Sequence, residues 1–181
     1  MSIFEVDVKK KPPVFLAKIY FGMGCFWGAE KRFWHLDGLY TTVVGYAGGH
    51  TNIPNYESVC SGKTGHAEVV KVIYDERKIH MKDLLKIFWE SHNPTQLNRQ
   101  GNDIGTQYRS MILTDKEDLI NDLEESKEKF QKILSSKSLG TICTEIKILK
   151  NFFVAEDYHQ KYLHKNPNGY CGLKGLEVNY L

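Results

Sequence analysis

Apolar residues follow two spacings along the chain, and together they predict a protein of mixed helices and strands. Short runs rich in Val, Ile, Thr and aromatic residues are typical of strands, whereas apolar positions three and four residues apart are typical of helices. Strands are expected at 14–21, 39–46, 67–74, 107–113 and 144–149. Helices are expected at 25–36, 82–90, 115–134 and 156–164.

The order of these elements predicts the fold class. Strand, helix, strand, strand, helix, strand is the order of a split βαβ unit, so we expect an α+β, ferredoxin-like sandwich (an α/β plait) with an added helix and a long C-terminal coil. No repeat or internal linker interrupts the 181 residues. We therefore expect one domain over 1–181, with an N-terminal lead-in at 1–13 and a mobile C-terminal tail at 165–181.

The strand at 67–74 has two different faces. Side chains alternate along a strand, so Glu68 shares the apolar face of Val70, Val72 and Tyr74, while Lys71 marks the more solvent-facing side. This pattern places a carboxylate at the end of an apolar face, where burial would raise its pKa.

Polar stretches and a capping signal complete the pattern. The stretches 49–65 and 93–106 are predicted as long loops, and loops of this length often carry function. Thr114, with Glu117 three residues later, resembles a capping box, so the long helix should begin at Asp115.

Composition narrows the function classes. The 24 basic and 22 acidic residues give a net charge of only +2, which argues against a nucleic-acid or membrane surface. The N-terminus is acidic and lacks the apolar centre of a signal peptide, so we expect a cytoplasmic protein with reduced thiols. The four cysteines (Cys25, Cys60, Cys143, Cys171) are too dispersed for a disulfide scaffold or a metal site.

Cys25 lies in the segment Gly24-Cys25-Phe26-Trp27-Gly28, where an expected strand meets an expected helix. Free N–H groups and the dipole of a helix start favour a thiolate, so we expect the pKa of Cys25 to be lowered. A buried structural cysteine is the alternative, because free cysteine is among the most buried residue types. The position alone leaves both interpretations open.

Other polar residues have roles that combine with a thiol. A desolvated Glu68 would be a general acid near neutral pH, and the hydroxyls of Tyr56 and Tyr108 would donate hydrogen bonds to an oxygen. Taken singly, the tyrosines are equally consistent with packing, Glu68 with a satisfied strand-end carboxylate, and Asp103 with a turn cap.

Five segments together resemble one enzyme family. These are 24–28 (Gly-Cys-Phe-Trp-Gly), 45–49 (Gly-Tyr-Ala-Gly-Gly), 65–68 (Gly-His-Ala-Glu), 105–110 (Gly-Thr-Gln-Tyr-Arg-Ser) and 156–160 (Glu-Asp-Tyr-His-Gln). They occur in the order found in A-type peptide-methionine sulfoxide reductases, and the resemblance runs from about residue 14 to 172.

The resemblance implies reduction of methionine S-sulfoxide, free or in proteins, without a metal or organic cofactor. It implies that Cys25 attacks the sulfoxide sulfur and that Phe26 and Trp27 form the pocket for the substrate methyl group. Glu68 would protonate the sulfoxide oxygen, with Tyr56 and Tyr108 hydrogen-bonded to it. Asp103 would hold the polar side of the pocket.

The resemblance also implies a redox cycle. Methionine formation leaves a sulfenic acid on Cys25, and Cys171 in the tail would resolve it as a Cys25–Cys171 disulfide, which thioredoxin or another dithiol reduces. Many relatives have a second resolving cysteine, but none occurs at 173–181. A second departure is Asn93, where relatives often have Asp, and we expect it to affect loop hydrogen bonds rather than chemistry.

Other functions remain alternatives at this point. A cysteine hydrolase or acyl transferase would pair Cys25 with a histidine such as His66, and a non-catalytic module would only bind methionine-containing peptides. His66 would also tune Glu68 if the two share a face. Cys60 and Cys143 are expected to be structural, and the protein is expected to be a monomer.

Overall fold

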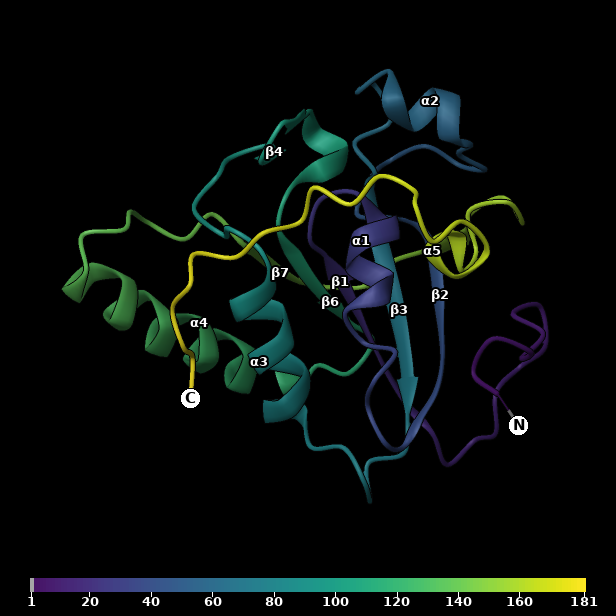
Figure 1. Ribbon diagram of the computed structural model, residues 1–181, viewed down its shortest axis with the longest axis horizontal. Helices are drawn as coiled ribbons and strands as arrows, with labels where there is room; N and C mark the ends of the chain where they lie inside the picture. The colour runs from purple at the N-terminus through teal and green to yellow at the C-terminus, as the bar shows by residue number, and fades with distance from the viewer. Residues whose placement is uncertain (1) are drawn as a thin grey trace.

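The structure is a computed structural model that describes residues 2–181, and these residues form a mixed α+β architecture (Figure 1). In chain order the elements are β1 (Ala17–Gly22), α1 (Phe26–Lys31), β2 (Leu39–Ala47), α2 (Tyr56–Cys60), β3 (Ala67–Tyr74), α3 (Met81–Ser91), β4 (Arg99–Gln100), β5 (Asp103–Ile104), the 3₁₀ helix η1 (Thr106–Tyr108), β6 (Met111–Thr114), α4 (Leu119–Ser136), β7 (Glu145–Ile148), β8 (Phe152–Val154) and α5 (Tyr162–Lys165).

A six-stranded sheet with the order β7-β6-β1-β3-β2-β8 forms the centre of the described residues. All neighbouring strands are antiparallel except β6 and β7, which are parallel. In this register Tyr46 of β2 lies opposite Glu68 of β3, which places the motif residues of both strands at one end of the sheet. The predicted mixed α+β class is confirmed.

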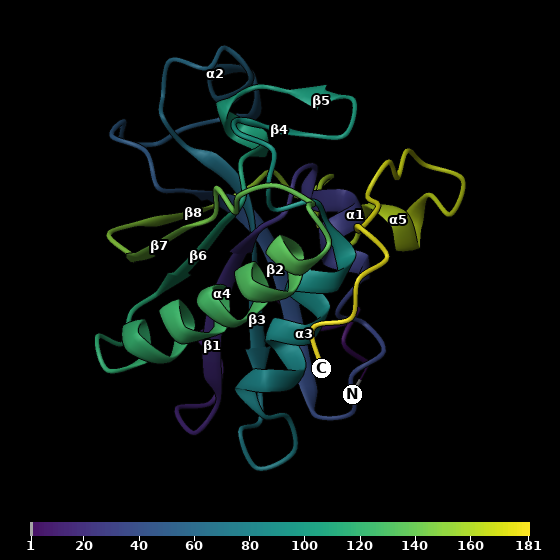
Figure 2. The same ribbon diagram turned by 90° about the vertical axis from the view of Figure 1, so that its left-hand side faces the viewer.

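The two faces of the sheet are covered differently. Helices α1, α3 and α4 lie over one face, as the two perpendicular views show (Figure 2), and the main core forms beneath them. A smaller apolar cluster on the other face includes Tyr20, Val69, Met111 and Leu113. β1 and β3 are buried on both faces, which explains why their sequences are almost continuously apolar.

The prediction for the faces of β3 is confirmed. Val70, Val72 and Tyr74 belong to the helix-covered core, and Lys71 is less buried than its neighbours. Glu68 is on the side of Val70 by strand alternation, and only 2% of its surface is exposed. The sheet therefore carries a buried carboxylate at the end of its apolar face.

The boundaries of several elements differ from the sequence prediction. Val14 and Phe15 are exposed, and β1 begins at Ala17 because the chain enters the core only there. The prediction that Thr114 caps the long helix was wrong, because Thr114 is a buried residue of β6 and α4 begins only at Leu119. Its hydroxyl accepts from the N–H of Lys116 and so forms a local turn instead of a helix cap.

Regular structure also forms inside the predicted loops. The stretch 49–65 contains α2, which begins with a capping box between Asn55 and Ser58. The stretch 93–106 contains the short hairpin of β4 and β5. The segment 107–113 divides into η1 and β6, and β8 was not predicted at all.

The tail after α5 has no regular structure, as predicted, but much of it packs on the body of the protein. It crosses α1 and then follows α3 (Figures 1 and 2). Leu173, Val178 and Tyr180 are buried in the main core. The Arg32 guanidinium donates to the carbonyl of Leu173 at 2.7 Å, and Tyr180 N–H donates to Glu90 at 2.7 Å. No helix within residues 2–181 is long and apolar enough to cross a membrane.

Candidate active site

Cys25 is the residue that leads into α1, where the chain leaves β1. Gly24 has a φ of +87°, a backbone conformation that side chains rarely adopt, and a Cβ there would lie 2.7 Å from the side chain of Gln100. Glycine is therefore needed before the cysteine. Phe26, Ala29 and Phe33 anchor the following turns in the core. The predicted position of Cys25 at a strand-to-helix junction is confirmed.

The predicted lowering of the Cys25 pKa was wrong for the substrate-free protein. The pKa of Cys25 is raised to about 12, mainly by burial and also by the carboxylate of Glu68, and the N–H groups of Trp27 and Gly28 oppose this shift only in part. α1 has six residues, so its dipole and N–H groups do not outweigh the loss of water around the sulfur. The resting group is a protonated thiol.

Glu68 has the properties expected of a general acid. Burial raises its pKa to about 8, Asp103 contributes in the same direction, and a hydrogen bond from Phe26 N–H to Oε2 at 2.9 Å opposes the shift. At neutral pH the carboxyl group is mostly protonated, so the charge that disfavours the Cys25 thiolate is mostly absent. The titrations of the two groups are therefore coupled, since ionisation of Glu68 disfavours the Cys25 thiolate.

One cavity of about 100 Å³ brings the predicted site residues together. Its lining residues are Cys25, Phe26, Trp27, Tyr56, Glu68, Asp103, Tyr108 and Tyr170. The aromatic rings of Phe26 and Trp27 provide its apolar side, and the two predicted tyrosines and two carboxyl groups provide polar atoms. Burial raises the pKa of both Tyr56 and Tyr108, so their hydroxyls remain donors over the whole neutral range.

Trp27 is fixed by residues from the far end of the chain. Its indole Nε1–H donates to Nδ1 of His159 at 3.0 Å, and its ring stacks on Tyr162 with centroids 3.8 Å apart. Since Nδ1 accepts this bond, the proton of neutral His159 is on Nε2, which is buried and has no hydrogen-bond partner among the described residues. The sequence predicted no role for His159 or Tyr162.

Tyr56 is placed by Glu156, another residue for which the sequence predicted no role. The carboxylate of Glu156 accepts from the backbone N–H of Tyr56 at 2.8 Å and from the hydroxyl of Tyr46 at 2.7 Å. Together with the cap at Asn55, this contact fixes the first residue of α2 above the sheet. The motif at 156–160 was a signal for such roles, because it combines Glu, His and Gln in one short segment.

Arg109 connects the segments that carry the polar wall. Its guanidinium donates to the carbonyls of Thr106 and Gly65 at 2.9 Å each, and its Nε donates to Glu145 at 3.1 Å. Thr106 begins η1, which ends at Tyr108, and Gly65 lies two residues before the strand that carries Glu68. The side chain of Arg109 is 11% exposed, so these bonds are largely shielded from water.

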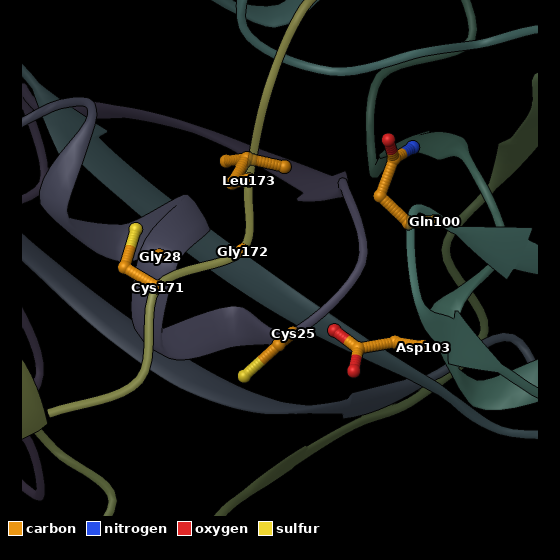
Figure 3. Close-up of a pocket in the computed structure, with 7 residues that line it drawn as sticks. All are labelled: Cys25, Gly28, Gln100, Asp103, Cys171, Gly172 and Leu173. Atoms are coloured by element: carbon orange, nitrogen blue, oxygen red, sulfur yellow. The ribbon is translucent and has the colours of Figure 1, made fainter.

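Cys171 lies on the other side of Cys25, in a separate small cavity of about 10 Å³ (Figure 3). Cys25, Gly28, Asp103 and Cys171 all line this cavity. Both sulfurs are free thiols, and Figure 3 shows them pointing in different directions. The hydroxyl of Tyr170 donates to Asp103 at 3.3 Å, which holds the tail beside the thiol pair.

His66 does not support the hydrolase alternative. Its Nδ1 accepts from Gly49 N–H at 3.1 Å, so Nε2 carries the proton and donates to the carbonyl of Thr51 at 2.8 Å. Both ring nitrogens are thus used to hold the loop after β2, and neither is left to take a proton from Cys25 or to contact Glu68. The expected tuning of Glu68 by His66 is not observed.

The remaining predicted residues lie outside the two cavities. Cys60 is exposed at the end of α2, and Cys143 donates to the carbonyl of Thr95 at 3.4 Å. The Oδ1 atom of Asn93 accepts from the backbone N–H and the hydroxyl of Thr95, so Asn93 takes part in the loop hydrogen bonds. The effect of Asn in place of Asp stays a prediction.

Sequence comparison identifies relatives over most of the chain. The family profile described as peptide methionine sulfoxide reductase matches residues 17–178. The mitochondrial peptide methionine sulfoxide reductase of Mus musculus is 57% identical over 159 residues, which cover 88% of this chain and 68% of the relative. The peptide methionine sulfoxide reductase of Photobacterium profundum is 55% identical over 166 residues, 91% of this chain and 79% of the relative.

Solved structures of methionine sulfoxide reductases also align with most of this chain. Methionine sulfoxide reductase A of Corynebacterium diphtheriae aligns with a TM-score of 0.85 and 44% identity, over 88% of this chain and 79% of that chain. Mxr1 of Saccharomyces cerevisiae, in complex with Trx2, aligns with a TM-score of 0.58 and 25% identity, over 86% of this chain and 90% of that chain.

Proposed function

The chain belongs to the peptide methionine sulfoxide reductase family, and we propose that it reduces methionine S-sulfoxide through Cys25, with Glu68 as the acid and Cys171 as the resolving thiol. One observation carries this assignment: a thiol and a buried carboxyl group with a pKa of about 8 line the same cavity as an aromatic wall. A sulfoxide needs all three, because its sulfur is electrophilic, its oxygen leaves only when protonated, and its methyl group is apolar.

The first step transfers oxygen and leaves the proton count unchanged. The sulfur of Cys25 attacks the sulfoxide sulfur and forms an S–S bond. The protonated oxygen then moves from that sulfur to Cys25 as the S–S bond breaks, which releases methionine and leaves a sulfenic acid on Cys25. Glu68 gives its proton to the departing oxygen and takes up the proton of the Cys25 thiol. Both groups are protonated in the resting protein, so this relay uses the state that burial favours. Tyr56 and Tyr108 donate to the oxygen, and Asp103 supports the polar side.

The second step closes the cycle. Cys171 attacks the sulfenic sulfur, water leaves, and a Cys25–Cys171 disulfide forms. The shared cavity and the glycine at position 28 favour this step, because they let the tail lie directly against α1. A dithiol then restores both thiols by exchange. The structure of Mxr1 in complex with Trx2 supports a thioredoxin as that dithiol.

Thiol counting tests the proposal. Reduced protein receives an equimolar amount of methionine S-sulfoxide, and methionine and free thiols are measured. We expect about one methionine formed and two thiols lost per chain. A hydrolase or a binding module would lose no thiol, which would contradict the proposal.

Two variants separate the roles of the cysteines. Cys25→Ser should form no methionine. Cys171→Ser should still complete one turnover but should not cycle with thioredoxin. Normal cycling of Cys171→Ser would show that another thiol resolves the sulfenic acid, and Cys60 would be the next to replace.

Several finer assignments are part of this proposal. The ferredoxin-like class is supported by the order β6-β1-β3-β2 inside the sheet. We keep the prediction of a single catalytic domain whose mobile tail carries the resolving cysteine. A monomer, a cytoplasmic location, no membrane or nucleic-acid partner and no cofactor also remain predictions. The mammalian relatives are named as mitochondrial proteins, so fractionation of cells is the direct test of location.

A further inference from the structure

A second, larger groove lies beside Cys171, and Cys25 is not among the residues that line it. Its volume is about 380 Å³, and it lies between α1 with its following turn and α3. Lys31, Arg32 and His35 line one side of it, Cys171 lies at its edge, and none of its lining residues is acidic. A volume of this size is in the range of sites for small molecules.

The position of Cys171 between two cavities determines how an external thiol would reach it. On one side Cys171 shares the small cavity with Cys25, and on the other it borders the groove. Disulfide exchange requires the attacking sulfur to approach opposite the sulfur that leaves. In a Cys25–Cys171 disulfide, a thiol in the groove would attack Cys171 and displace Cys25. In Figure 3 the Cys171 sulfur already points away from Cys25.

The charge of the groove determines which thiol is favoured. Lys31, Arg32 and His35 are exposed, and Arg32 is oriented by its bond to the carbonyl of Leu173. The carboxylate of Glu90 on α3 accepts from Lys86 and from Tyr180 N–H, so its charge is compensated locally. A ligand with carboxylates would therefore gain attraction from the groove and meet no opposing charge in its lining.

We propose that this groove binds a small anionic thiol, such as a carboxylate-bearing thiol peptide, which reduces the disulfide at Cys171. The inference rests on the proposed function, since it needs the Cys25–Cys171 disulfide. The thiolate attacks Cys171, the S–S bond breaks, and Cys25 leaves as a thiolate that takes up a proton. A second thiol molecule attacks the mixed disulfide, releases Cys171 and leaves as the oxidised small disulfide.

The test compares thiols of different charge on the same disulfide. The probes are glutathione, neutral 2-mercaptoethanol and cationic cysteamine, and the readout is the rate at which free thiols reappear. The disulfide is prepared with methionine S-sulfoxide. If two thiols are not lost when the disulfide is prepared, the proposed function is contradicted. The groove is tested only after the disulfide has formed, so the two failures can be told apart.

Lys31→Glu should lower the glutathione rate by roughly tenfold at low salt, leave the 2-mercaptoethanol rate unchanged and raise the cysteamine rate. Lys150→Glu is the matched control, because Lys150 is exposed, lies outside the groove and gives the same change in net charge. Peptide mapping after rapid quenching should find the glutathione adduct on Cys171. Equal effects of Lys31→Glu and Lys150→Glu, or an adduct on Cys25, would overturn the inference.

Discussion

At the scale of single residues, the site is controlled by burial more than by the helix start. The glycines and aromatic residues around Cys25 correctly indicated its place in the fold, but not its pKa. Sequence patterns show what precedes a helix, whereas desolvation depends on residues from distant segments, here Asp103, Tyr170 and Glu68. This is why the pKa of Glu68 could be predicted from its strand face and that of Cys25 could not.

The pH dependence of the first turnover follows from Glu68. Its pKa is raised from the usual value of a glutamate to about 8, so the protonated form is present below pH 8 and is lost as the pH rises. The rate of methionine formation in a single turnover should be constant near pH 7 and should fall by about tenfold per pH unit well above 8.

Glu68→Gln should be slower by at least about a hundredfold, and its rate should no longer fall through pH 8. Stopped-time assays of methionine, without thioredoxin, measure this step alone. A wild-type rate that increases steadily from pH 7 to 9 would contradict the relay, since it would mean that loss of the Cys25 proton limits the step.

At the scale of elements, the sequence predicts the strands of the sheet better than the connections. β3 was predicted with its observed bounds and α3 to within one residue at each end, because these residues alternate or recur on one face. The α2 helix was missed because five residues show no periodicity and its capping box lies in a polar stretch. Thr114 was misassigned because the same cap signal occurs at a strand end.

A buried ion pair links α1 to the segment before α5. Lys161 Nζ lies 3.0 Å from Glu30 Oε1 and also donates to Thr42, and the side chains of Lys161 and Glu30 are 6% and 0% exposed. The Lys161 N–H donates to the second oxygen of Glu30. This cluster holds the segment with His159 and Tyr162 against α1, and no pattern in the sequence indicated it.

Lys161→Met should destabilise the protein by about 3–5 kcal/mol, because Glu30 is left as an uncompensated buried charge. The double variant Glu30→Gln/Lys161→Met should lose less than the sum of the two single variants. Urea unfolding curves measure the free energy of unfolding of each variant.

Lys9→Met, which removes the exposed pair with Asp157, is the control and should leave the unfolding free energy nearly unchanged. Additive single effects would show that the buried charges are not coupled.

Gly28 on α1 should affect resolution but not the first turnover. A Cβ at this position would lie 3.1 Å from the sulfur of Cys171 and 3.3 Å from Leu173 Cβ, so the tail must shift. The Gly28→Ala variant should therefore form methionine at a normal rate, but its Cys25–Cys171 disulfide should form severalfold more slowly, as measured by loss of the second thiol. Both rates are measured in one sample, so the first serves as the control for folding. Unchanged thiol loss would show that the tail does not resolve the sulfenic acid from its observed position.

At the scale of the whole molecule, the tail combines an anchored part with a part that the proposed mechanism requires to move. Leu173, Val178 and Tyr180 are buried, and these contacts join the end of the chain to α1, α3 and α4. The sequence predicted the lack of regular structure but not this anchoring, because single apolar residues in a coil follow no periodic pattern. Movement of Cys171 toward Cys25 is thus confined to the residues around it.

Limited proteolysis of the reduced and the oxidised protein tests this division of the tail. Forming the disulfide must turn the Cys171 sulfur toward Cys25 and rearrange the short segment 166–172, whereas Val178 and Tyr180 should keep their buried positions. We therefore expect cleavage after Tyr170 to change by at least severalfold between the two states, while 176–181 stays equally protected. A Cys171→Ser variant treated with methionine S-sulfoxide is the control, because it forms the sulfenic acid but not the disulfide. Loss of protection at 176–181 on oxidation would mean that the whole tail detaches from the rest of the protein.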